Sequence, residues 1–145
     1  MIANERQYKI TKAALRRFEK AIDAHEGDGS SPDVAPRIQQ ATLEALVSEA
    51  DELRAQIKRY EALRDGEIKQ RELTSLRELP IALIEARIAA GLTQKALAER
   101  LGVPQQQVQR WEASRYSGVG VERLQEIADA LGVEVREILT YASAG

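Results

Sequence analysis

The sequence predicts an all-α protein built in two parts. Apolar residues recur at the spacing of three or four that is typical of amphipathic helices, and no run alternates with the period of a strand. Glycine and proline divide the second half of the chain into short helical segments, whereas the first half holds two long ones. Residues 67–76 are mostly polar. We therefore expect a domain boundary near residue 74, with parts spanning 1–74 and 75–145.

The composition excludes several functional classes. The chain has 21 Lys and Arg against 23 Asp and Glu, a net charge of −2, so it is not a polybasic protein held on nucleic acid by bulk charge. It has no cysteine and one histidine, His25, which leaves no thiolate zinc site and no His-pair metal motif. No nucleophile and base pair stands out. We expect no metal, no cofactor and no enzymatic activity.

The first residues are polar from Asn4 onward, which argues against a secretory signal peptide. The longest strictly apolar runs are four or five residues. A membrane-spanning helix needs about 20. We expect a soluble, cytoplasmic protein.

The first part predicts a helical hairpin. One helix is expected over about 4–25, with Tyr8, Leu15 and Ile22 spaced by seven along one apolar stripe. Residues 26–33 contain two Gly, two Ser and a Pro, which is typical of a loop. A second helix is expected over about 36–64.

The second helix carries a seam of apolar residues at the a and d positions of a heptad repeat. Its members are Leu43, Leu46, Ala50, Leu53, Ile57 and Tyr60. Two interpretations stay open. The seam packs on the first helix, or Leu43, Leu46, Leu53, Ile57 and Tyr60 form a dimerising coiled coil; both hold if two hairpins pair.

The second part predicts five short helices, at about 79–90, 93–101, 105–113, 121–131 and 134–141. Gly91, Gly102 and Gly132 end three of them, and Thr93 is placed to cap the second. The link between the second and third helices has three residues and includes a glycine. Such a tight link between two short helices is typical of a helix-turn-helix motif.

The stretch from Gly91 to Glu112 reads GLTQKALAERLGVPQQQVQRWE, and residues 124–133 read LQEIADALGV. The first resembles the lambda-repressor and Cro type of helix-turn-helix, the XRE family, and the second resembles the fourth helix of that family. The resemblance covers about residues 79–140. It implies a five-helix lambda-repressor-like domain that binds double-stranded operator DNA, commonly as a dimer on an inverted repeat.

The third helix of this part carries the residues expected to read bases. At about 100° per residue, Val108 and Trp111 define its buried side. The opposite side carries Gln106, Gln109 and Arg110, with Gln105 at its edge. Glutamine bonds adenine and arginine bonds guanine in the major groove. The resemblance assigns base reading to the same positions.

Phosphate contacts are expected on both sides of this helix. Thr93, Gln94 and Lys95 stand at the start of the helix 93–101, where backbone N–H groups attract anions. Arg115 and Tyr116 follow the helix 105–113, which is expected to read bases. The resemblance further implies a partly buried ion pair between Arg87 and Glu112 that orients that helix.

Two functions remain open from the sequence. The first is a homodimeric transcriptional repressor that regulates its own gene, with residues 1–74 joining two DNA-binding domains. The alternative is an antitoxin, whose N-terminal helices bind a toxin protein while the second part binds the operator. The basic face of residues 6–20 has three interpretations: a contact with flanking DNA, a contact with an acidic partner, or a solvated surface.

Overall fold

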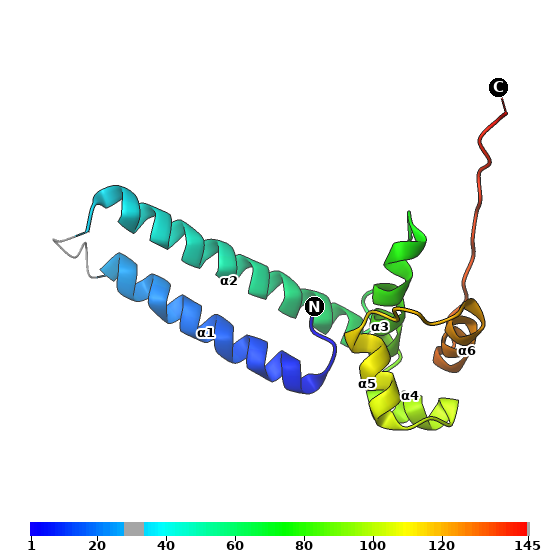
Figure 1. Ribbon diagram of the computed structural model, residues 1–145. Coiled ribbons are helices and arrows are strands. Elements are labelled where there is room, and N and C mark those ends of the chain that lie inside the picture. The colour runs from blue at the N-terminus through cyan, green and yellow to red at the C-terminus, as the bar shows by residue number, and fades with distance from the viewer. Residues whose placement is uncertain (28–33, 145) are drawn as a thin grey trace. The chain divides into compact units, whose positions relative to one another are not determined.

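The computed structural model describes residues 1–27 and 34–144, and every regular element among them is helical (Figure 1). The chain divides into two compact units, Met1–Lys69 and Gln70–Gly145. The division falls before the boundary expected near residue 74. The reason is that residues 70–75 bond to the second unit: Arg71 donates to Glu85 at 2.9 Å, and the backbone N–H of Thr74 donates to Glu78 at 2.7 Å.

The first unit is an antiparallel hairpin of two long helices, α1 (Glu5–Gly27) and α2 (Pro36–Arg64). At the start of α1, the side chain of Asn4 accepts a hydrogen bond from the backbone of Gln7 at 2.8 Å. At the start of α2, Pro36 occupies the first turn, where its missing N–H costs nothing. Of the loop expected at 26–33, residues 26 and 27 belong to α1, and 28–33 lie outside the described residues.

Aromatic packing joins the two helices near the open end of the hairpin. The rings of Tyr8 and Tyr60 stack with their centroids 5.0 Å apart, and both side chains are buried. Each hydroxyl donates to a carboxylate of the other helix, from Tyr8 to Glu61 and from Tyr60 to Glu5. These bonds tie the start of α1 to the end of α2.

The heptad seam of α2 lies against α1 within one chain. Ala50 has no exposed surface, which lets the two backbones approach closely, and Tyr60 is buried. The remaining seam residues are partly buried: Leu43, Leu46, Leu53 and Ile57. Because Tyr60 is used inside the hairpin, it presents little surface to a second chain.

The second unit contains a short 3₁₀ turn, η1 (Leu76–Glu78), and four α-helices. These are α3 (Leu79–Ala89), α4 (Gln94–Leu101), α5 (Gln105–Ala113) and α6 (Val121–Leu131). The helices expected over 79–131 are confirmed to within a residue at each end. α4 packs on α5 and α6, and α3 packs on α6. The core residues that they share include Leu83, Ile84, Leu97, Val108 and Ile127.

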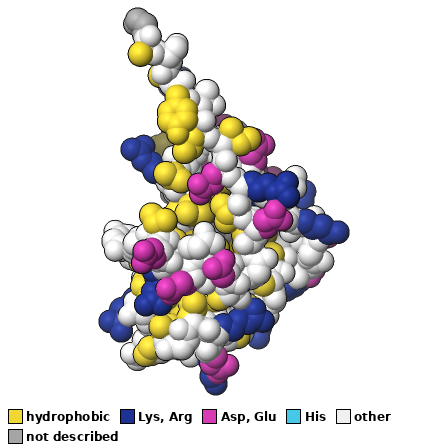
Figure 2. Space-filling view, turned by 90° about the vertical axis from the view of Figure 1, so that its right-hand side faces the viewer, with side chains coloured by type: hydrophobic (Ala, Val, Ile, Leu, Met, Phe, Trp, Pro, Cys, Tyr) yellow, Lys and Arg dark blue, Asp and Glu magenta, His cyan; other side chains and the backbone are white. Residues whose placement is uncertain are grey.

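The expected fifth helix of this unit is absent. Residues 133–144 have no regular secondary structure. Ile138, Leu139 and Tyr141 are 94%, 72% and 85% exposed, and apolar side chains line this segment in Figure 2. An isolated helix this short is unstable in water, and within the described chain these side chains find no apolar surface to cover. The apolar spacing alone is therefore insufficient to form the helix.

Among residues 1–27 and 34–144, none of the helices has the length and apolar character needed to cross a membrane.

Candidate nucleic-acid interface

A tight turn sets α5 steeply against α4. Gly102 ends α4 with φ of +67°, a left-handed conformation that glycine adopts without strain. The backbone N–H of Val103 then donates to the carbonyl of Ala98 at 3.0 Å, and Pro104 precedes the first turn of α5. Ala98 is buried, and its small side chain permits the close approach of the two helices. The turn thus ends α4 and begins α5 within three residues, and the two helices pack on each other.

The outward side of α5 is polar and free of carboxylates. The four side chains expected to read bases are all exposed: Gln105, Gln106, Gln109 and Arg110. Val108, on the opposite side, has no exposed surface. Gln106, Gln109, Arg110 and Ala113 line a shallow hollow on this side. The surface therefore offers amide donors and acceptors beside one guanidinium, the groups that hydrogen-bond base edges.

A buried ion pair anchors the inner side of α5. Arg87 of α3 binds Glu112 of α5 through two hydrogen bonds of 2.7 Å, and both side chains are 3% exposed. The guanidinium also donates to the carbonyl of Leu92 at 2.9 Å. The carboxylate also accepts a 2.9 Å bond from the side-chain amide of Gln94, the first residue of α4. One network thus links α3, α4 and α5.

This network has an electrostatic consequence for the surface. Glu112 lies two residues after Arg110, the last residue of the outward side of α5, and a free carboxylate there would repel phosphate. Its charge is compensated at contact distance by Arg87, so the interface carries less negative potential than the sequence suggests. The network also fixes Gln94, which stands at a helix N-terminus where backbone N–H groups and the helix dipole favour an anion.

The residues expected to contact phosphate fall into two groups. Thr93, Lys95 and Arg115 are exposed. The hydroxyl of Thr93 accepts a 3.0 Å bond from the backbone of Ala96, so it caps α4. Tyr116 lies elsewhere: it is 4% exposed, and the expectation that it contacts phosphate is wrong.

The backbone explains the burial of Tyr116. Arg115 and Tyr116 both have φ of +55°, which turns the chain back so that the Tyr116 ring stacks on Trp111 with centroids 6.4 Å apart. Burial raises the pKa of the Tyr116 hydroxyl, and the charge of Glu112 raises it further. The hydroxyl has no hydrogen-bond partner among the described residues. Neither residue is Gly or Asn, so the sequence carries no signal for this turn.

A second contact of the Trp111 ring also lacks a signal in the sequence. The guanidinium of Arg123, in α6, lies 5.6 Å from the ring centroid of Trp111. Trp111 is thus enclosed by Tyr116 and Arg123 and is positioned for packing rather than for base stacking. Cation–π pairs of this kind have no fixed sequence spacing, so only the fold brings them together.

The helix-turn-helix family model matches residues 83–138, a segment that runs from α3 through α6 into the C-terminal tail. This segment is a helix-turn-helix domain of the XRE type. The match supports a DNA-binding helix-turn-helix regulator, with double-stranded DNA as the ligand of the matched segment. The match covers less than half of the chain and leaves the hairpin outside it. The chain matches no curated protein and no solved structure.

The ion pair predicts a large stability effect. Arg87→Ala leaves the Glu112 carboxylate buried without its partner, so we expect a loss of about 3–5 kcal/mol in the free energy of unfolding. Chemical unfolding of the full chain, followed by circular dichroism, measures it. Glu126→Ala is the matched control, because it breaks an exposed pair with Arg123 and is expected to change stability by less than about 1 kcal/mol. Equal effects of the two variants would contradict the assigned role of the pair.

The buried hydroxyl of Tyr116, which has no hydrogen-bond partner among the described residues, predicts that its removal stabilises the protein. Removing a buried polar atom that lacks a hydrogen bond relieves a cost of about 1–3 kcal/mol. Tyr116→Phe keeps the ring against Trp111, so we expect a higher melting temperature and unchanged DNA affinity. A lower melting temperature would mean that the hydroxyl has a partner in solution.

Proposed function

We propose that the protein is a sequence-specific transcriptional regulator that acts as a homodimeric repressor, including of its own gene. The observation that carries this proposal is the exposed face of α5, with Gln105, Gln106, Gln109 and Arg110 held outward by the buried pair behind them. In this proposal these side chains read base edges in the major groove. Thr93, Gln94, Lys95 and Arg115 position the domain on the phosphates, which fixes register without specifying sequence.

The charge of the second unit supports a specific rather than a bulk mode of binding. Residues 70–145 hold nine Lys and Arg against ten Asp and Glu, a net of −1. Non-specific attraction to phosphate is therefore weak, and affinity depends on base contacts, each contributing about 1–3 kcal/mol of discrimination. One such domain offers a small interface, so two copies on an inverted repeat are needed for useful affinity, with half-sites about one helical turn apart.

The hairpin is assigned to dimerisation. The antitoxin alternative would favour a segment that folds only on its toxin. The stacked tyrosines and the buried Ala50 support instead a hairpin that is ordered in the free chain. A small basic protein encoded beside this chain and retained on it during purification would favour the antitoxin.

The proposal predicts selective binding to DNA from upstream of the protein's own gene. Fluorescence anisotropy at two salt concentrations compares this duplex with a scrambled one. Gln106→Ala and Arg110→Ala should each weaken binding to the upstream duplex by about 1–3 kcal/mol, or about 5- to 150-fold, and leave binding to the scrambled duplex nearly unchanged.

Lys95→Ala serves as the matched control, since a lost phosphate contact weakens both duplexes alike and lowers the salt dependence. Equal weak binding of the wild type to both duplexes would contradict autoregulation. Selective binding that survives both α5 variants would contradict base reading by α5.

A further inference from the structure

The charges of the hairpin are segregated along its length. Glu19 pairs with Arg54 at 3.2 Å, and Tyr8 stacks on Tyr60, so residues 5–20 and 54–64 lie together; we name them the proximal half. Residues 21–26 and 36–53 form the distal half. The proximal half holds ten Lys and Arg against three Asp and Glu, a net of +7. The distal half holds one Arg against six Asp and Glu, a net of −5.

Internal bonds accentuate this separation. All three carboxylates of the proximal half are bonded within the hairpin: Glu5 to Tyr60, Glu19 to Arg54 and Glu61 to Tyr8. By contrast, several of its cations form no ion pair or hydrogen bond among the described residues, and these include Lys9, Arg16 and Lys20. The proximal half thus presents positive charge that no ion pair among residues 1–27 and 34–144 compensates.

Both charge clusters reach one broad face of the hairpin. On α1, counted from the buried Tyr8, Lys9, Arg16 and Asp23 are rotated by about 60–100°. On α2, counted from the buried Ala50, Val47 and Glu44 are rotated by about 60–120° in the same sense. The helices are antiparallel neighbours, so equal rotations from their contact line lead to the same face.

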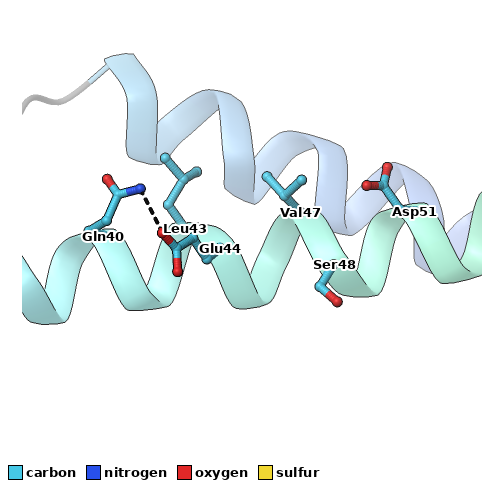
Figure 3. A pocket seen from close by; sticks show the side chains of 6 residues that line it. All are labelled: Gln40, Leu43, Glu44, Val47, Ser48 and Asp51. Atoms are coloured by element: carbon cyan, nitrogen blue, oxygen red, sulfur yellow. Dashed lines mark hydrogen bonds between the residues drawn. The ribbon is translucent and has the colours of Figure 1, made fainter.

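The distal part of this face also carries apolar surface. Figure 3 shows Leu43 and Val47 one turn apart on α2, projecting to the same side, with Asp51 on the next turn. Gln40, Glu44 and Ser48 complete the lining of this shallow groove, and Val47 is 38% exposed. Glu44 accepts a 3.0 Å bond from the amide of Gln40 and keeps its negative charge at the rim.

We propose that this face binds a second copy of the same face in antiparallel orientation, with the proximal half of each hairpin on the distal half of the other. This inference rests on the homodimer of the proposed function and specifies its arrangement. The pairing sets +7 against −5 twice, related by a two-fold axis, and covers both apolar grooves. Parallel pairing would instead oppose the two proximal halves, where like charges repel.

A second copy complements the charges of both halves of this face, whereas a polyanion complements only the proximal half. DNA would complement the proximal half but would be repelled by the six carboxylates of the distal half. Only a partner with the same segregated pattern, reversed in direction, compensates both halves and also covers the grooves. The antiparallel arrangement has a structural consequence as well. It separates the C-terminal ends of the two α2 helices by about 43 Å, the length of 29 helical residues.

The first test measures the distance between the two distal ends in the full chain without DNA. The sequence has no cysteine, so Ile38→Cys, at a site 59% exposed, accepts a single nitroxide label. Pulsed dipolar spectroscopy should give a label separation of about 35–45 Å, close to the length of α2. A separation near two helix diameters, about 20 Å, would mean parallel pairing and would overturn the inference.

The second test reverses charges on the face and follows the dimer dissociation constant by sedimentation. Lys9→Glu with Arg16→Glu should raise this constant about tenfold or more, and so should Asp23→Lys with Glu44→Lys. All four changes together should restore dimerisation, because the four exchanged charges again meet opposite charges across the two-fold axis. Arg17→Glu and Glu52→Lys are matched controls: they alter the same halves but point away from the face, and should leave the dimer unchanged.

The outcomes separate this inference from the proposed function. If the unmodified chain is a monomer at micromolar concentration, both the arrangement and the homodimer of the proposed function are wrong. A dimer with labels about 20 Å apart overturns the arrangement alone, and selective binding to the upstream duplex is decided separately by anisotropy. If the proximal reversal weakens binding to all DNA and leaves the dimer intact, the basic half contacts phosphate and the inference fails. Recovery of the dimer in the fourfold variant is the result that supports it.

Discussion

The buried ion pair between Arg87 and Glu112 is the interaction on which the DNA-binding unit depends. Removing two charges from water is costly, and their attraction offsets that cost only when the remaining donors and acceptors are bonded. Both requirements are met here. The guanidinium also bonds the carbonyl of Leu92, and the carboxylate also bonds the amide of Gln94. The pair therefore holds α5 at one angle to α3 and fixes the first residue of α4 beside it.

The nearly zero net charge of each unit is the second constraint. Neither the unit 1–69 nor the unit 70–145 carries more than one net charge, so neither is attracted strongly to DNA as a whole. Recognition then depends on where the charges are placed. In the second unit the carboxylate of α5, Glu112, is paired internally, which leaves amides and a guanidinium on the outward side of that helix. In the hairpin, positive and negative charges are sorted to opposite ends, which favours a partner with the same pattern reversed.

Much of this architecture could be predicted from the sequence, because local signals coincide with the tertiary structure. Gly102 ends α4 in a left-handed conformation and Thr93 caps its start, so the bounds of α4 follow from single residues. The exposed face of α5 follows from helical phase. The tail 133–144 could not be predicted this way, because its apolar spacing suits a helix but residues 1–27 and 34–132 offer it no apolar surface to cover. The burial of Tyr116 depends on two left-handed residues that nothing in their chemistry favours.

We infer that the Arg87–Glu112 pair orients α5 and does not merely stabilise the fold. Arg87→Met, Glu112→Leu and the double variant, measured for both unfolding free energy and affinity for the upstream duplex, test it most directly. Apolar residues of similar volume can replace a buried pair at little cost in stability. We expect the double variant to recover much of the stability lost by either single variant. Its preference for the upstream over the scrambled duplex should stay reduced, because the pair no longer holds α5 at its angle to α3. A double variant that discriminates between the duplexes as well as the unmodified chain would contradict it.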